Sequence, residues 1–189
     1  MRLFVAVDPP PAAVQDLEKA LRSRGLPAAR PDLRWVPAEQ WHVTLAFLGE
    51  VAEDRLDELC TRLARAAGRH SPLTAHLHAA GTFGSGARAR LLWAGLDCDR
   101  LALRRLTESV TAAARRSGID VDAGRFHPHV TLARARRPSD LSDCTAAMAG
   151  YRGPAWSLDA VRLVRSALGA GAQGRPVHET LHRWPLHGR

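Results

Sequence analysis

The sequence predicts an α+β fold in which a strand–helix–strand–helix–strand unit occurs twice. Two observations carry this prediction. Apolar residues change repeatedly between a strand period and a helix period, with proline or glycine near the changes. In addition, the tetrapeptide HVTL occurs at 42–45 and again at 129–132, on the second predicted strand of each unit. Such a duplication predicts that both copies face one shared cleft at a pseudo-two-fold axis.

The first unit covers roughly residues 1–85. An apolar run forms its first strand, and three consecutive prolines end that strand and can begin a helix. Gly25 ends this helix, and acidic residues suit the start of the next one because of the helix dipole. The five predicted elements are a strand at 3–7, a helix at 14–21, a strand at 42–49, a helix at 53–63 and a strand at 73–79.

The second unit covers roughly residues 86–189 and repeats this order. Leucine and valine at helical spacing mark its first helix, and a β-branched run marks the strand that carries HVTL again. The predicted elements are a strand at 91–96, a helix from 103 to about 118, a strand at 129–134, a helix at 138–149, a strand at 156–164 and a further strand at 178–184. We expect one domain over residues 1–189, with the two units as pseudo-symmetric halves.

Two glycine-rich stretches are predicted to be loops. Residues 81–90, GTFGSGARAR, lack the GK[ST] of a phosphate-binding P-loop, so we expect a hairpin connection. Residues 166–175, SALGAGAQGR, form the second loop. Either loop could border the cleft.

The composition is that of an ordinary soluble protein. The chain has 189 residues, of which 46% are hydrophobic and 24% charged. No apolar run approaches the roughly 20 residues that a membrane helix needs, and the apolar stretch at the N-terminus is too short for a signal peptide. We therefore expect a cytoplasmic protein without a membrane partner, and a monomer.

The net charge of +8 favours anionic partners, of which nucleic acid is the usual one. Lys19 is the only lysine among 27 basic residues, a bias typical of a GC-rich genome, so this charge has moderate weight. Arginine nevertheless suits phosphate, because its planar fork donates two parallel hydrogen bonds. The three cysteines contain no CxxC pair, so we expect buried, reduced and inert thiols.

The repeated HxT motif supplies one imidazole and one hydroxyl on each of two predicted strands. Side chains alternate along a strand, so His42 and Thr44 share one face, as do His129 and Thr131. Two such pairs facing each other can hold a tetrahedral anion with one imidazole on each side of the phosphorus. One imidazole can take a proton from water while the other gives a proton to the departing oxygen, since the reference pKa of imidazole is about 6.5.

These residues carry a family resemblance. HVTL at 42–45 and FHPHVTLAR at 126–134 resemble the two HxTx signatures of the two-histidine (2H) phosphoesterase superfamily, in particular its bacterial RNA 2′,3′-cyclic phosphodiesterases, also called 2′-5′ RNA ligases. The resemblance spans nearly the whole chain, in order: MRLFVAVDPP, RWVPAEQWHVTLAFLGEV, RLLWAGL and VRLVRSALGAG. It implies two antiparallel-rich lobes around a central cleft, with helices outside.

The resemblance also implies roles for single residues. His129 occupies the motif position, whereas His127 occupies a variable one. His42 resembles the proton donor and His129 the proton acceptor. Thr44 and Thr131 would bind phosphate oxygens.

Two further positions match the family pattern: Phe47 resembles a residue that stacks on a base, and Arg134 one that contacts phosphate. Strict alternation, however, puts Phe47 and Arg134 on the face opposite the histidines, and they reach the cleft only if the strand ends or bulges.

The implied function is metal-independent hydrolysis of RNA 2′,3′-cyclic phosphate ends to 2′-phosphomonoesters, without a cofactor. The partner would be RNA, including tRNA fragments, or a nucleotide with a cyclic phosphate. The resemblance also implies that the enzyme can catalyse the reverse reaction, 2′-5′ RNA ligation. A non-catalytic RNA-binding module and a phosphodiesterase acting on a non-RNA cyclic phosphate, such as ADP-ribose cyclic phosphate, are the alternatives.

Two other sites stay open on the residues alone. The HxH pairs at 127–129 and 76–78 could ligate a metal, although no Asp, Glu or Cys supports them at suitable spacing. A histidine-triad hydrolase would need a third histidine at position 131, where Thr131 stands.

Overall fold

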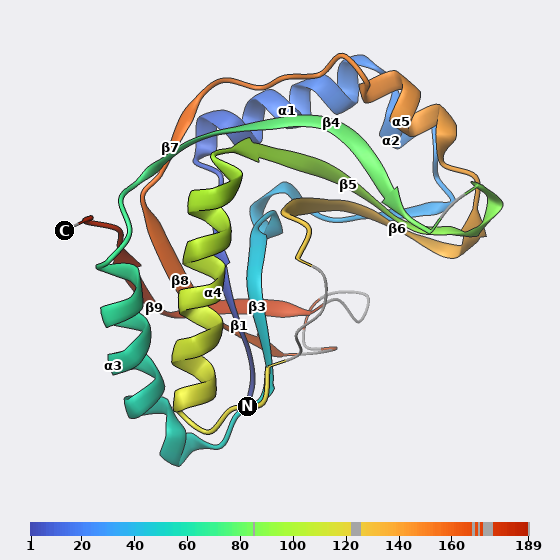
Figure 1. The fold of residues 1–189 in the computed structure, drawn as a ribbon. Helices are drawn as coiled ribbons and strands as arrows, with labels where there is room; N and C mark the ends of the chain where they lie inside the picture. The colour runs from blue at the N-terminus through green and yellow to red at the C-terminus, as the bar shows by residue number, and fades with distance from the viewer. Residues whose placement is uncertain (85, 122–125, 168, 170, 172–175, 189) are drawn as a thin grey trace.

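Nine strands form one antiparallel sheet in the computed structural model, which describes residues 1–84, 86–121, 126–167, 169, 171 and 176–188. The helices lie outside the sheet, so the α+β fold class is confirmed (Figure 1). In chain order the elements are β1 (Arg2–Val7), α1 (Pro11–Ser23), α2 (Leu26–Ala29), β2 (Leu33–Trp35), η1 (Ala38–Gln40), β3 (Val43–Glu50), η2 (Glu53–Arg55), α3 (Leu56–Ala67), β4 (Leu73–Phe83), η3 (Gly86–Arg88), β5 (Ala89–Cys98), α4 (Arg100–Arg116), β6 (His129–Ser139), α5 (Ser142–Met148), β7 (Trp156–Leu158), β8 (Ala160–Ala167) and β9 (Val177–Pro185).

The strand order is β7-β4-β5-β6-β3-β1-β8-β9, and β2 pairs with β6. Two groups of four strands therefore meet where β6 pairs with β3. The groups do not follow the division of the chain at residue 85: β4 lies beside β5, whereas β8 and β9 lie beyond β1. Helices α1 and α5 contact β4, while α3 and α4 lie side by side over the other group (Figure 1).

Most predicted elements are present, and two need correction. The strand predicted at 156–164 is two strands, because β7 pairs with β4 whereas β8 pairs with β1, and Asp159 lies between them. The helix predicted from residue 138 begins at Ser142, because Ser139 still pairs with β5. The short elements α2 and β2 were not predicted, since four and three residues are too few to show a period.

Local sequence explains several helix ends. Proline stands at the first position of α1, where its missing N–H costs no hydrogen bond. Gly25, after the end of α1, has a φ of 68°, a conformation that favours glycine. The Asp99 carboxylate caps α4 by accepting hydrogen bonds from the backbone N–H groups of Leu101 and Ala102 at 2.9 and 3.0 Å.

The main core lies between the sheet and the helices. Val43 and Val130 belong to it, as do Leu63 of α3 and Leu106 of α4. A second, smaller cluster lies on the other face of the sheet and consists of Phe4, Ala6 and Val164. The odd-numbered residues of β1 thus face the main core, and Phe4 and Ala6 face away from it.

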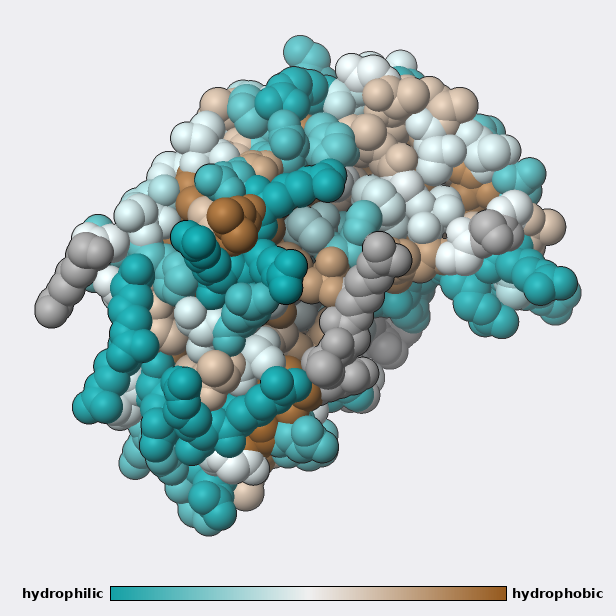
Figure 2. Space-filling view, viewed as in Figure 1, coloured by the Kyte–Doolittle hydropathy of each residue, from teal (hydrophilic) through white to brown (hydrophobic). Residues whose placement is uncertain are grey.

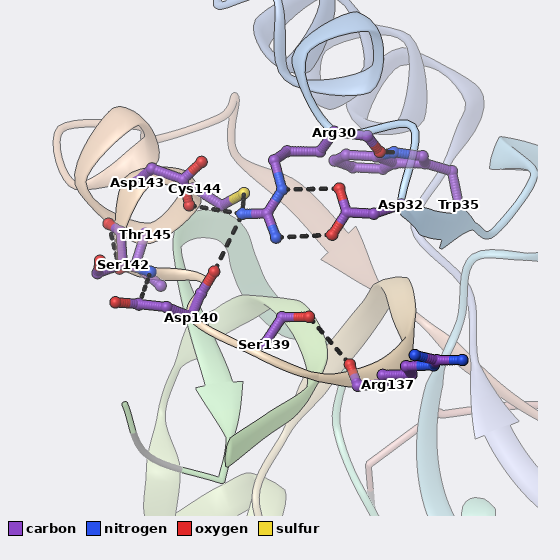
Figure 3. A network of polar contacts seen from close by, with 10 residues as sticks. All are labelled: Arg30, Asp32, Trp35, Arg137, Ser139, Asp140, Ser142, Asp143, Cys144 and Thr145. Carbon is purple, nitrogen blue, oxygen red and sulfur yellow. Dashed lines mark hydrogen bonds and ion pairs between the residues drawn. The ribbon is translucent and has the colours of Figure 1, made fainter. Parts of the chain in front are cut away.

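A polar network around Arg30 holds the segment before β2 against α5 (Figure 3). The side chain of Arg30 is only 14% exposed and forms ion pairs with Asp32 at 2.9 Å and Asp143 at 2.7 Å. It also donates a hydrogen bond to the Asp140 carbonyl, and the Trp35 indole donates to the Arg30 carbonyl. The strand β2 that follows Arg30 and Asp32 pairs with residues 133–135 of β6.

The remaining predictions concern loops and thiols. β4 and β5 pair with each other as expected of a hairpin, but the predicted loop was too long, because residues 81–83 belong to β4 and residues 89–90 to β5. Most of the second glycine-rich loop, 168, 170 and 172–175, lies outside the described residues. The three cysteines are free, but only Cys144 is buried, whereas Cys60 and Cys98 are half-buried. None of the helices described here is long and apolar enough to cross a membrane.

Candidate active site

The two HxT motifs meet where the two strand groups join. Val43 of β3 pairs with Val130 of β6, and both side chains enter the main core. Because neighbouring side chains point to opposite faces, the histidine and threonine on either side of each valine point away from the core. The antiparallel register sets His42 across from Thr131 on this face, and Thr44 across from His129.

A β-bulge in β3 brings Phe47 to the same face. Ala6 of β1 pairs with Thr44, Val5 pairs with Ala46, and Leu45 is the extra residue between them. Leu45 and Ala46 are both buried in the main core, so the alternation shifts by one residue. Phe47 then pairs with Phe4, which faces the histidine side.

The same bulge recurs in β6 and brings Arg134 to the site face. Trp93 of β5 pairs with Thr131 and Leu92 pairs with Ala133, so Leu132 is the extra residue. Arg134 pairs with Leu91, which shares its face with Trp93. The strict alternation that put Phe47 and Arg134 on the opposite face is therefore wrong, because each strand bulges immediately after its HxT.

Both histidine rings are held in the same way. The Nδ1 of His42 donates a hydrogen bond to the Gln40 carbonyl at 2.7 Å, and the Nδ1 of His129 donates to the His127 carbonyl at 2.7 Å. A carbonyl oxygen can only accept, so Nδ1 carries the proton in each neutral ring. The Nε2 atom of each imidazole is thereby left as the atom that can exchange a proton with a bound molecule.

His42 lies in an enclosed aromatic environment. Its ring stacks on Phe4 with the centroids 4.9 Å apart, and the ring of His178 stands edge-on at 5.2 Å. The pKa of His42 is lowered to about 4, mainly by burial and in addition by the neighbouring His178, Arg162 and His129, while the hydrogen bond to the Gln40 carbonyl acts in the opposite direction. His42 is therefore neutral at pH 7 when no anion is bound.

His129 has aromatic neighbours from the other strand group. Phe83 stands edge-on to it at 4.9 Å between centroids, and the Trp93 ring lies at 6.2 Å. Burial lowers the pKa of His129 below the ordinary value, the hydrogen bond to the His127 carbonyl opposes this shift, and the charges of the His127 ring and Arg134 lower the pKa as well. At pH 7 each imidazole therefore carries one proton, on Nδ1, and its Nε2 is unprotonated.

The HxH pairs do not gather further metal ligands in the described part of the chain. No group of three His, Cys, Asp or Glu side chains there could hold a metal ion. His127 is exposed and packs edge-on against Trp93, with 4.5 Å between centroids. His76 donates a hydrogen bond from Nδ1 to the Gly153 carbonyl.

Sequence reasoning did not find three side chains that surround the pair. His178 of β9 approaches His42, whereas Phe83 and Trp93 approach His129. The Nδ1 of His178 is buried without a hydrogen-bond partner among the described residues. No local signal could find His178, because it is 136 residues from His42 and the two meet only through the sheet order.

The assembled face can bind a phosphate diester. Two neutral imidazoles and two hydroxyls stand diagonally across the β3–β6 junction, and Arg134 adds a positive charge at one side. A monoanionic phosphate placed between the imidazoles would favour protonation of one of them, because an opposite charge stabilises the imidazolium. The face can then supply one proton donor and one proton acceptor.

This chain is similar to known proteins over most of its length. The sequence pattern of the 2′-5′ RNA ligase superfamily matches residues 6–170. A protein of Escherichia coli (strain K12) named RNA 2′,3′-cyclic phosphodiesterase is 32% identical over 188 residues, which cover 98% of this chain and 96% of that protein. A protein of the same name from Geobacillus stearothermophilus is 31% identical over 164 residues, which cover 84% of this chain but 49% of that protein. This chain therefore spans about half the length of the Geobacillus relative.

Among solved structures, the crystal structure of E. coli LigT complexed with 3′-AMP superposes with a TM-score of 0.76 at 29% sequence identity. The match covers 98% of this chain and 97% of LigT. The likeness therefore includes both strand groups and the junction between them.

Proposed function

The chain belongs to the 2′-5′ RNA ligase superfamily, and from this premise we propose that this phosphoesterase hydrolyses the 2′,3′-cyclic phosphate ends of RNA to 2′-phosphomonoesters. The observation that carries the proposal is that the two HxT motifs lie next to each other in antiparallel orientation. Each motif supplies one imidazole with its Nδ1 fixed and one threonine, on a shared face of β3 and β6. The relatives named RNA 2′,3′-cyclic phosphodiesterase support this choice of substrate.

The two imidazoles divide the proton transfers. His129 Nε2 takes a proton from water as the water oxygen attacks phosphorus. The bond between phosphorus and the ribose 3′-oxygen breaks on the opposite side, and protonated His42 gives its Nε2 proton to that oxygen. The products are a 2′-phosphomonoester and a 3′-hydroxyl. Exchange with solvent then returns a proton to His42 and removes one from His129.

Substrate binding prepares His42 for this role. The lowered pKa keeps its ring neutral in the free protein, and the negative phosphate raises that pKa by attraction. Thr44 and Thr131 donate hydrogen bonds to the two phosphate oxygens that do not react. Phe47, which is 67% exposed, offers a ring for stacking with a base, and Arg134 contacts a phosphate oxygen.

The same opening of the ring explains ligation. If a 5′-hydroxyl of a second RNA attacks in place of water, the product is a 2′-5′ phosphodiester. Neither reaction has a step that requires a metal ion, because the imidazoles move both protons and the threonines and Arg134 contact the phosphate oxygens.

A short RNA with a 2′,3′-cyclic phosphate end tests the proposal. Phosphorus NMR of the reaction with wild-type protein should show the 2′-monoester, and a chelator should leave the rate unchanged. His42→Ala should still bind this RNA, measured by fluorescence anisotropy, and should not open the ring. If the wild-type protein binds RNA but does not hydrolyse it, the protein is a non-catalytic RNA-binding module. If it hydrolyses ADP-ribose cyclic phosphate in preference to RNA, its substrate is not an RNA end.

A further inference from the structure

A basic groove lies between α3 and α4, away from the histidines. It has a volume of about 530 Å³. Hydrophilic side chains gather over these two helices on the surface (Figure 2). The groove is lined by Arg62, Arg65, Ala66, Arg69, His70, Arg105, Glu108, Ser109, Ala112, Ala113 and Arg116.

The arginines form two facing stripes. Arg62, Arg65 and Arg69 recur at intervals of three and four residues along α3 and the turn that follows it, so they share one side of the helix. Arg105 and Arg116 are eleven residues apart on α4, which is three helical turns, and so they also share a side. Small residues form the floor between the stripes, and Ala66 and Ala113 are buried there.

Five arginines and one acidic residue line this groove, and Asp57 and Glu58 lie beside Arg62 and Arg65 at one side of it. Glu108 is the one acidic residue among the lining residues, and it pairs with Arg104 outside the groove at 2.8 Å. Arg62 pairs with Glu58. For the remaining four arginines, Arg65, Arg69, Arg105 and Arg116, no ion pair or side-chain hydrogen bond occurs among the described residues.

The groove and the histidines occupy opposite sides of the sheet. Helices α3 and α4 bury Leu63 and Leu106 in the main core, the same core that receives Val43 and Val130. His42 and His129 point to the other face of β3 and β6. A molecule seated in the groove therefore leaves the candidate active site open.

The length of the stripes points to a chain of phosphates. Arg105 and Arg116 are about 16 Å apart along the axis of α4, at 1.5 Å per residue, and the stripe of Arg62, Arg65 and Arg69 extends from α3 into the turn that follows it. A single phosphate group can reach only part of such a stripe. A polymer with a negative charge on each unit can pair with arginines along its whole length, since each guanidinium donates two parallel hydrogen bonds to a phosphate.

We propose that the groove between α3 and α4 is a second binding site, for the sugar–phosphate backbone of RNA. The choice of RNA among polyanions rests on the proposed function, because the substrate there is an RNA end whose remaining chain must lie somewhere. The groove then holds the body of a long RNA while its cyclic end occupies the histidine face.

Binding without catalysis tests the site itself. We compare Arg65→Gln/Arg105→Gln, which removes one charge from each stripe, with Lys19→Gln/Arg22→Gln, which removes two exposed charges on α1. The probe is a fluorescent single-stranded RNA with a 3′-hydroxyl end, titrated by anisotropy at several salt concentrations. The groove variant should lose roughly 2- to 30-fold in affinity. Its slope of log affinity against log salt should become shallower by about 1.4, since each single-strand contact contributes roughly 0.7.

The control variant should lose much less affinity than the groove variant, because it changes only the net charge of the protein. Equal losses in the two variants would show that binding follows net charge, and the groove would not be a site. Thermal melting of both variants checks that they fold, which we expect because all four side chains are exposed.

Turnover separates this proposal from the proposed function. On a nucleoside 2′,3′-cyclic phosphate, which is too small to reach the groove, wild type and groove variant should share one kcat/KM. On long RNAs with the same end, the groove variant should show a raised KM and an unchanged kcat. If the wild type hydrolyses neither substrate, the proposed function is wrong. The binding experiment still shows whether the groove binds RNA. If the variant is equally active on long RNA, the groove does not hold the substrate's body.

Discussion

Val43 of β3 lies directly opposite Val130 of β6, and this pair stands at the centre of the site. The valines anchor the junction in the core, so the four polar side chains beside them project together from the other face. The two halves of the site are thereby related by an approximate two-fold axis through the valine pair.

The first prediction separates the neighbouring histidines. His129→Ala should lower kcat by about 10²- to 10⁴-fold, the usual contribution of a positioned acid or base. His127→Ala is the matched control and should change kcat far less, because His127 supplies its backbone carbonyl to His129, which the substitution retains. Equal losses, measured by single-turnover hydrolysis of a cyclic-phosphate RNA, would show that His127 shares the proton transfer.

The second prediction assigns the proton donor. Protonation of the leaving group matters only when that group is poor. An aryl phosphodiester with a p-nitrophenol leaving group should therefore restore the activity of His42→Ala towards that of the wild type, and should not restore His129→Ala. Release of p-nitrophenolate is followed by absorbance. Rescue of His129→Ala instead would exchange the two roles and leave the two-histidine site intact.

The third prediction concerns the threonines. A hydrogen bond to a charged oxygen contributes about 1.5–3 kcal/mol, so Thr44→Val and Thr131→Val should each slow turnover by roughly one to two powers of ten. Valine keeps the shape of threonine, and both positions are half-buried, so folding should be retained. Full activity in either variant would mean that its hydroxyl does not meet the phosphate.

The fourth prediction links His42 to stability. Its pKa is about 4 in the folded protein and about 6.5 when unfolded, so the unfolded chain binds the proton first as pH falls. The free energy of unfolding is therefore unaffected by this proton above about pH 6.5, and it decreases as pH falls from about 6.5 towards 4. The loss amounts to about 3 kcal/mol relative to His42→Gln. Urea unfolding of both proteins at pH 7 and pH 4 measures the difference, and parallel losses would contradict the burial of this ring.

The fifth prediction tests the side chains that the bulges place on the site face. Phe47→Ala should raise KM for a nucleotide substrate by roughly five- to a hundredfold, because base stacking contributes about 1–3 kcal/mol. Arg134→Gln should likewise raise KM. Arg22→Gln, on the exposed side of α1, is the charge-matched control and should leave KM unchanged. Unaltered KM in both site variants would place the nucleotide elsewhere.

Much of the local structure could be predicted from the sequence. Alternation and helical stripes depend on neighbouring residues alone, so the positions of β1, β3, α3 and α4 follow from them. The repeated HVTL likewise indicated which histidines share a face with a threonine. The bulges left a local sign as well: Leu45–Ala46 and Leu132–Ala133 are consecutive apolar pairs that interrupt the alternation.

The tertiary structure alone decided which strands became neighbours. Pairing depends on how the whole chain buries its apolar faces together, which no local pattern contains. The run at 156–164 therefore divides between two distant parts of the sheet, and His178 reaches His42 across 136 positions. For the same reason the repeated HxT could predict a shared cleft, whereas only the pairing of Val43 with Val130 decided which residues of the two motifs stand opposite each other.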